Sequence, residues 1–210
     1  MKLHEKAHYL ISSDESKEYF KNLMDDIISA LLGDRAAFAK AMLTFAKTPF
    51  LIREQLFWAK LSAFINGVYL SDTDKNKLCA KITENGTKRD NPRRLLELID
   101  RAETQQKVQY LINVTRSLLT DSIDLPNYFR ICHAITHTLE EDLDFLKENI
   151  DKSDLPYNVC VQGLLTNGLM YQSVIDGNGD QKYSFTIIAE YVTRFALSDN
   201  HIDHYSKMSI

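Results

Sequence analysis

Two histidines four residues apart have the clearest capacity for chemistry in this 210-residue chain. On one continuous helix, His133 and His137 would share a face. The carboxylates of Glu140 and Asp144 would extend that face. Two imidazoles and a carboxylate can hold zinc or non-haem iron, so one hypothesis is a metal-dependent enzyme. The pair lacks the glutamate that metalloproteases place directly after the first histidine. We therefore favour a hydrogen-bonded histidine pair at a helix interface.

The segment from Asp176 to Asp180 is a second candidate for ion binding. Its Asp-x-Asn-x-Asp pattern is typical of the start of a calcium loop. The sixth and twelfth positions of such a loop should be Gly and Glu, and here they are Gln181 and Ile187. The Asp-Gly-Asn-Gly run instead predicts a β-hairpin turn, and we expect no metal or other cofactor.

A basic cluster surrounds the start of a predicted helix. Its members are Lys88, Arg89, Arg93 and Arg94. These side chains could contact nucleic acid, another anion or an acidic protein, although a solvated helix face is the more common outcome. The sequence contains no glycine-rich phosphate loop and no Gly-x-Ser-x-Gly nucleophile motif, so it predicts no catalytic residue.

The composition is that of an ordinary globular protein. Hydrophobic residues make up 44% of the chain, the formal net charge is −4, and the 7 Gly and 4 Pro disfavour a many-stranded sheet protein. Cys79, Cys132 and Cys160 lack metal-type spacing and are expected to be reduced thiols. The first residues lack the apolar core of a signal peptide, and no uncharged apolar run approaches the roughly 20 residues that span a bilayer. We expect a cytoplasmic protein.

Helical periodicity dominates the N-terminal region, which we place at residues 1–120. Apolar residues recur every three or four positions over 17–32 and again after the helix-start signal Thr48-Pro49. The segment 36–70 combines aromatic and basic residues, a composition that suits the surface of an anionic membrane. The same residues could form the core beneath a later helix, which is the interpretation we favour.

Capping signals define the later elements. Asn91-Pro92 starts a helix that would run to Thr120 if it were continuous. A capping box formed by Thr138 and Glu141 predicts a helix break near Thr138. The other expected elements are helices 126–137, 140–150 and 156–167, a stop at Gly168, strands 169–175 and 182–187, and a closing amphipathic helix.

Three helices, a hairpin and a further helix in this order resemble a winged helix-turn-helix domain over residues 124–198. The resemblance depends on the Gly168-Leu169 stop, the short second helix and the strand-to-helix junction at 183–186. We therefore expect a mainly α protein, a helical bundle whose C-terminal region, 121–210, is winged-helix-like with one short β-hairpin. We expect that region to pack with residues 1–120 as one unit.

The resemblance implies DNA binding through the third helix, but the residues there oppose it. Residues 156–168 contain no Lys or Arg. Residues 126–198 hold five basic and ten acidic side chains, a balance of −5. Such a surface repels a phosphate backbone, so we do not expect nucleic acid to be the partner.

We favour a non-enzymatic protein that binds another protein. An acidic helical protein of this size is typical of toxin-neutralising immunity proteins and antitoxin-like partners, because many nuclease toxins are basic. The expected contact residues are the acidic ones of the C-terminal region: Glu140, Glu141, Asp144, Asp176 and Asp180. The alternatives are a winged-helix DNA-binding regulator that uses the basic cluster, and a metal-dependent enzyme at His133 and His137.

Overall fold

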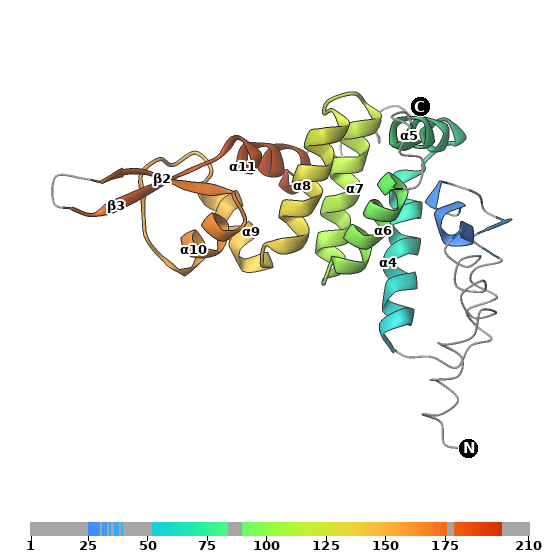
Figure 1. The fold of residues 1–210 in the computed structure, drawn as a ribbon, viewed down its shortest axis with the longest axis horizontal. Helices are drawn as coiled ribbons and strands as arrows, with labels where there is room; N and C mark the ends of the chain where they lie inside the picture. Colours follow the sequence, from blue (N-terminus) through green and yellow to red (C-terminus); the bar gives the residue numbers. More distant parts are fainter. Residues whose placement is uncertain are drawn as a thin grey trace, which may run out of the picture.

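The described part of the chain is mainly helical, with one small antiparallel sheet, as the sequence predicts. The computed structural model describes residues 25–29, 31–32, 34, 36–37, 39, 52–83, 90–175 and 179–198. The helices are α4 (Ile52–Val68), α5 (Asp72–Thr83), α6 (Asp90–Arg101), α7 (Gln105–Leu119), α8 (Leu125–His137), α9 (Glu140–Asn149), α10 (Val159–Thr166) and α11 (Ile187–Val192), followed by the π-helix η1 (Thr193–Leu197). The strands are β1 (Leu155–Pro156), β2 (Met170–Ile175) and β3 (Gln181–Phe185). Figure 1 shows the hairpin of β2 and β3 projecting from the end opposite α4 and α5.

Helix α7 lies at the centre of the helical part. Eleven of its 15 residues are buried, and α4, α8 and η1 all pack against it. Because it is buried on most of its surface, its polar side chains need partners inside the protein. The Asn113 amide donates to the carbonyl oxygen of Ala196 at 2.9 Å, and the Thr115 hydroxyl lies 3.1 Å from that of Tyr128. These contacts join α7 to both η1 and α8.

The described part of the segment 36–70 forms core. Helix α4 buries Trp58, Leu61, Phe64 and Val68 and packs against α6 and α7. The predicted start signal at Thr48-Pro49 lies outside the described residues. Among the described residues, no helix combines the length and the apolar character needed to cross a membrane.

The helix that starts at Asn91-Pro92 is not continuous to Thr120. Helix α6 ends at Arg101, and α7 begins at Gln105 after a short connection. Thr104 stops the helix because its side chain accepts a hydrogen bond from the backbone N–H of Lys107 at 3.1 Å, which caps α7. The break lets the two helices point in different directions, so α6 also reaches α8.

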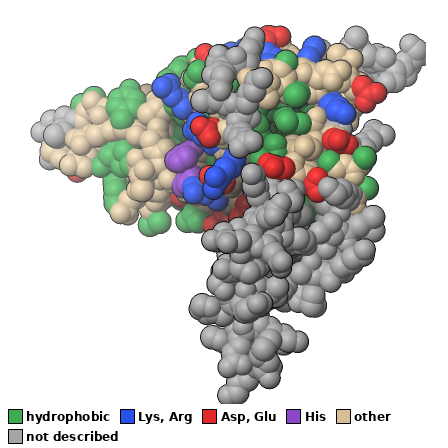
Figure 2. Space-filling model, turned by 45° about the vertical axis from the view of Figure 1, so that its right-hand side comes forward, with side chains coloured by type: hydrophobic (Ala, Val, Ile, Leu, Met, Phe, Trp, Pro, Cys, Tyr) green, Lys and Arg blue, Asp and Glu red, His purple; other side chains and the backbone are tan. Residues whose placement is uncertain are grey.

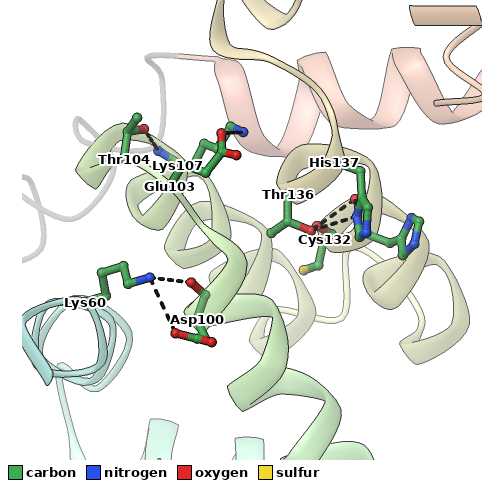
Figure 3. Close-up of polar contacts among 9 residues, drawn as sticks. Lys60, Asp100, Glu103, Thr104, Lys107, Cys132, Thr136 and His137 are labelled. Carbon is green, nitrogen blue, oxygen red and sulfur yellow. Dashed lines mark hydrogen bonds and ion pairs between the residues drawn. The ribbon is translucent and has the colours of Figure 1, made fainter. Parts of the chain in front are cut away.

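A buried lysine lies directly after this break. Lys107 is only 1% exposed, and its Nζ lies 3.1 Å from Oε2 of Glu103, which is 67% exposed (Figure 3). A buried ammonium needs a counter-charge, because its removal from water is costly. The Lys60 ammonium hydrogen-bonds to the backbone oxygen of Asp100, which links α4 to the end of α6.

The C-terminal elements follow the predicted order, with one added strand. Helices α8, α9 and α10, the β2–β3 hairpin and α11 correspond to the expected helices and strands. Leu155 and Pro156 form β1, which pairs with β3 to give the sheet order β1-β3-β2. The expected helix start at Pro156 is therefore wrong. Helix α10 begins at Val159, because the Asn158 side chain accepts a hydrogen bond from the backbone N–H of Val161 at 2.8 Å.

Two helix boundaries in this region were predicted from the sequence, the end of α10 at Gly168 and the break between α8 and α9 at Thr138. Gly168 ends α10 with φ of 71°, a left-handed conformation that favours glycine, as expected. The helix break near Thr138 is confirmed, but the capping box is not formed. Leu139 is the N-cap of α9 and provides no side-chain cap, while the buried Thr138 hydroxyl has no hydrogen-bond partner among the described residues.

The closing helix changes its geometry in its second half. Helix α11 starts after Thr186, whose hydroxyl accepts from the backbone N–H of Ala189. From Thr193 onward the chain forms the π-helix η1. A π-helix leaves the regular hydrogen-bond ladder, and the Asn113 amide of α7 contacts one of its carbonyl oxygens, that of Ala196.

Helices α9 and α10 are in close contact at Gly163. A Cβ atom added at Gly163 would lie 2.0 Å from Oδ2 of the buried Asp142. Burial raises the pKa of Asp142, and a hydrogen bond from the Cys160 thiol opposes this shift. The structure therefore explains a glycine in the middle of a helix, where alanine is normally favoured.

Replacement of this glycine tests the contact. Gly163→Ala is expected to lower the free energy of unfolding by about 2 kcal/mol, because the new methyl group must displace the Asp142 carboxylate. In an Asp142→Ala background the same substitution should be neutral or stabilising, as glycine-to-alanine changes in helices usually are. Urea denaturation of the four proteins measures both effects. A Gly163→Ala protein as stable as the parent would contradict the contact.

Candidate functional site

The two candidate histidines form a stacked pair on α8. Their ring centroids are 3.8 Å apart and the rings are inclined by 17°. The break after α8 places Glu140 and Asp144 on α9 rather than on a continuation of the histidine helix. Among the described residues, no group of three or more His, Cys, Asp or Glu side chains could hold a metal ion.

Both ring nitrogens of His137 are engaged. Nε2 lies 2.8 Å from Nη1 of Arg101, and Nδ1 lies 2.8 Å from the backbone oxygen of His133. Nδ1 also lies 3.2 Å from the Thr136 hydroxyl oxygen (Figure 3). A guanidinium can only donate and a carbonyl can only accept. Both ring nitrogens of His137 are therefore occupied by protein groups, which leaves neither for a metal.

The histidine pair lies in a basic environment. The guanidinium of Arg94 lies over the ring of Phe129, 4.4 Å from its centroid, at the contact between α6 and α8. Partial burial lowers the pKa of His133, and the nearby His137, Arg94 and Arg101 lower it further. Figure 2 shows blue basic side chains next to the histidines on the surface, with red acidic side chains at the edge of this group.

We name Arg94, Arg101, His133 and His137 the α6–α8 basic cluster. Arg94 belongs to the basic cluster that we predicted from the sequence. The histidine pair was predicted as a separate site, and the structure brings the two together. Arg93 instead pairs with Glu97, Nε to Oε1 at 3.4 Å, and Lys88 and Arg89 lie outside the described residues. Arg101 was missed, although its position seven residues after Arg94 places both on one face of α6.

A second charged surface lies on α9. Glu141, Asp144 and Glu148 are exposed and spaced by three and four residues, so they follow one face of the helix; we call them the acidic stripe. Acidic residues in a first turn stabilise a helix, which gives Glu141 a structural role as well. Glu148 lies in the last turn, where a negative charge is unfavourable to the helix.

Exposed apolar side chains lie at the starts of α9 and α10. Leu139 precedes α9 and is 59% exposed, while Tyr157 and Val159, at the start of α10, are 56% and 82% exposed. Helix α10 packs against α9, so these side chains and the acidic stripe belong to one pair of helices.

The expected acidic contact residues do not form one group. Glu141 and Asp144 lie on the acidic stripe, and Glu140 is half-buried at its start. Asp180 is exposed near the outer end of the hairpin, which Figure 1 shows projecting away from α9. Asp176 lies outside the described residues. The hairpin turn is supported by Gly179, whose φ of 88° favours glycine.

Two of the cysteines, Cys132 and Cys160, have thiols whose pKa is raised rather than lowered. All three are free thiols. Burial raises the pKa of the Cys132 thiol to about 12, and burial together with the nearby Asp142 raises that of Cys160. A thiol needs a lowered pKa to react as a thiolate near neutral pH.

Comparisons with known proteins place no constraint on these surfaces. No family model matches the chain, and neither the curated proteins nor the solved structures compared with it include a match. Function is therefore inferred from the geometry of the α6–α8 basic cluster and the acidic stripe.

The electrostatic coupling within the basic cluster is measurable. The pKa of His133 should lie below the roughly 6.5 of an exposed histidine and should rise in Arg101→Gln, because one neighbouring positive charge is lost. Since the folded state disfavours protonated His133, its contribution to stability is present above about pH 6.5 and decreases as the pH falls through the lower folded pKa.

A titration of the His133 Cε1–H signal by NMR follows this pKa. Arg194→Gln is the matched control, because Arg194 is also an exposed arginine over a phenylalanine ring, that of Phe195. An unchanged His133 pKa in Arg101→Gln would contradict the coupling.

Proposed function

We propose that this chain is a non-enzymatic protein that binds a basic protein partner through the acidic stripe and the exposed apolar residues beside it. The observation that carries the proposal is the position of Glu148. Its carboxylate is exposed in the last turn of α9, where it weakens the helix, and it takes part in none of the ion pairs among the described residues. A partner's positive charge would offset this cost.

The surrounding surface suits a protein contact. Protein interfaces combine apolar anchors, often aromatic, with a polar rim, and charge complementarity increases the rate of association. Leu139, Tyr157 and Val159 supply exposed apolar area at the starts of α9 and α10, and α9 also carries the exposed carboxylates. An immunity protein or antitoxin that neutralises a basic nuclease toxin has these requirements, and this is the class of partner that we favour.

In this proposal the winged-helix-like region binds the partner protein rather than DNA. The order of helices and hairpin supports the resemblance, and the added strand β1 enlarges the sheet. In that resemblance α10 would correspond to the DNA-reading helix, but it carries neither Lys nor Arg and packs against the acidic α9. These features favour a protein over DNA as the partner of this region.

Charge reversal on the acidic stripe tests the proposal. The tagged protein, purified from its native host at about 150 mM salt, should retain a stoichiometric basic protein. Asp144→Lys/Glu148→Lys should reduce its recovery tenfold or more, which corresponds to about 1.4 kcal/mol or more of binding free energy. Mass spectrometry identifies the partner and quantifies the loss.

A matched variant separates the stripe from net charge. Asp25→Lys/Asp72→Lys makes the same change in charge at exposed carboxylates on other helical segments, and it should retain the partner. Equal losses in both variants, or recovery of nucleic acid without a protein, would contradict the proposal.

A further inference from the structure

We propose that the α6–α8 basic cluster binds a phosphate group, either as inorganic phosphate or as the terminal group of a small phosphorylated molecule. This inference does not depend on the proposed function, because the cluster lies on other helices than the acidic stripe. The four side chains come from two packed helices, and all four are exposed to solvent.

The positive charge of the cluster is not neutralised within the described residues. Arg94 and Arg101 take part in none of the ion pairs found there. Of the acidic residues along α6 near these arginines, Glu97 pairs with Arg93, and Asp100 lies 3.9 Å from Nζ of Lys60 through its Oδ1. The groups that shift the pKa of His133 by charge are all basic, namely His137, Arg94 and Arg101. Such a concentration of like charge is unfavourable unless an anion offsets it.

The hydrogen bonds of the cluster leave donors available. Arg101 uses Nη1 to bond His137, and its guanidinium carries further N–H groups. His137 in turn is fixed by the carbonyl oxygen of His133, so the bond to His137 holds the Arg101 guanidinium in position. The ring nitrogens of His133 make no hydrogen bond with the described residues.

The arginine side chains are also held in place before a ligand arrives. The guanidinium of Arg94 stacks on Phe129, which restricts its side chain, and its N–H groups make no hydrogen bond to any described residue. Preorganised arginines lose less conformational entropy on binding than free ones. Arginine forks and imidazole are typical partners of phosphate, which offers several strong acceptor oxygens and up to two negative charges.

The size of the cluster favours a small ligand over a nucleic acid. It consists of two arginines and two histidines on neighbouring helices, whereas affinity for nucleic acid requires cation contacts to several successive phosphates. The net charge of −4 over the whole chain opposes such an extended contact.

Titration with inorganic phosphate and with AMP, each at constant ionic strength in sodium chloride, tests the assignment. Either ligand should shift the NMR signals of His133 and His137 saturably and raise the pKa of His133, because the bound anion stabilises the imidazolium. Tighter binding of AMP would identify a phosphorylated molecule as the ligand, and equal or tighter binding of inorganic phosphate would identify the free ion. Arg94→Gln and Arg101→Gln should each weaken binding about tenfold.

The control is again Arg194→Gln, which removes the same charge from an exposed, ring-stacked arginine elsewhere and should change the affinity less than about twofold. Circular dichroism confirms that each variant is folded. The inference is overturned if the histidine signals respond to phosphate no more than to chloride, or if all three variants lose affinity equally. It is also overturned if duplex DNA binds with a steep salt dependence while phosphate and AMP do not.

Discussion

The burial of α7 is the constraint on which the rest of the structure depends. A helix that is covered on most of its surface must satisfy each polar group that it takes out of water. Lys107 forms an ion pair with Glu103, the Asn113 amide donates to a carbonyl oxygen of the π-helix, and the hydroxyls of Thr115 and Tyr128 of α8 are hydrogen-bonded. These partners lie before α7, after the sheet and on the next helix, so the burial of one helix determines how segments far apart in the sequence are placed.

This arrangement separates two surfaces of opposite charge. The break at Thr104 directs α6 toward α8, where Arg94 and Arg101 meet the histidine pair. The second break, after Thr138, directs α9 away from α8 and exposes its carboxylates. A continuous helix at either break would have placed the basic and acidic residues differently, so both proposed binding surfaces depend on short connections rather than on the long helices.

Much of the fold could be predicted from the sequence, because local signals are strong where one residue dominates. Gly168 ends α10 through its left-handed backbone, at the stop that the sequence predicts. Predictions were wrong where two local signals competed. Pro156 suits the first turn of a helix but also a short edge strand, and pairing with β3, which is distant in the sequence, decides between them. The candidate site was predicted only in pieces, because the contact of Arg101 with His137 spans 36 residues and two helices.

Native-state hydrogen exchange measures most directly whether the helices packed against α7 unfold together with it. If they do, the slowest amides of α4, α7 and α8 exchange through one global opening, with free energies that agree within about 1 kcal/mol. The account would be contradicted if the slowest amides of α8 opened with a free energy several kcal/mol below that of the slowest amides of α7. That result would show that the C-terminal elements unfold independently.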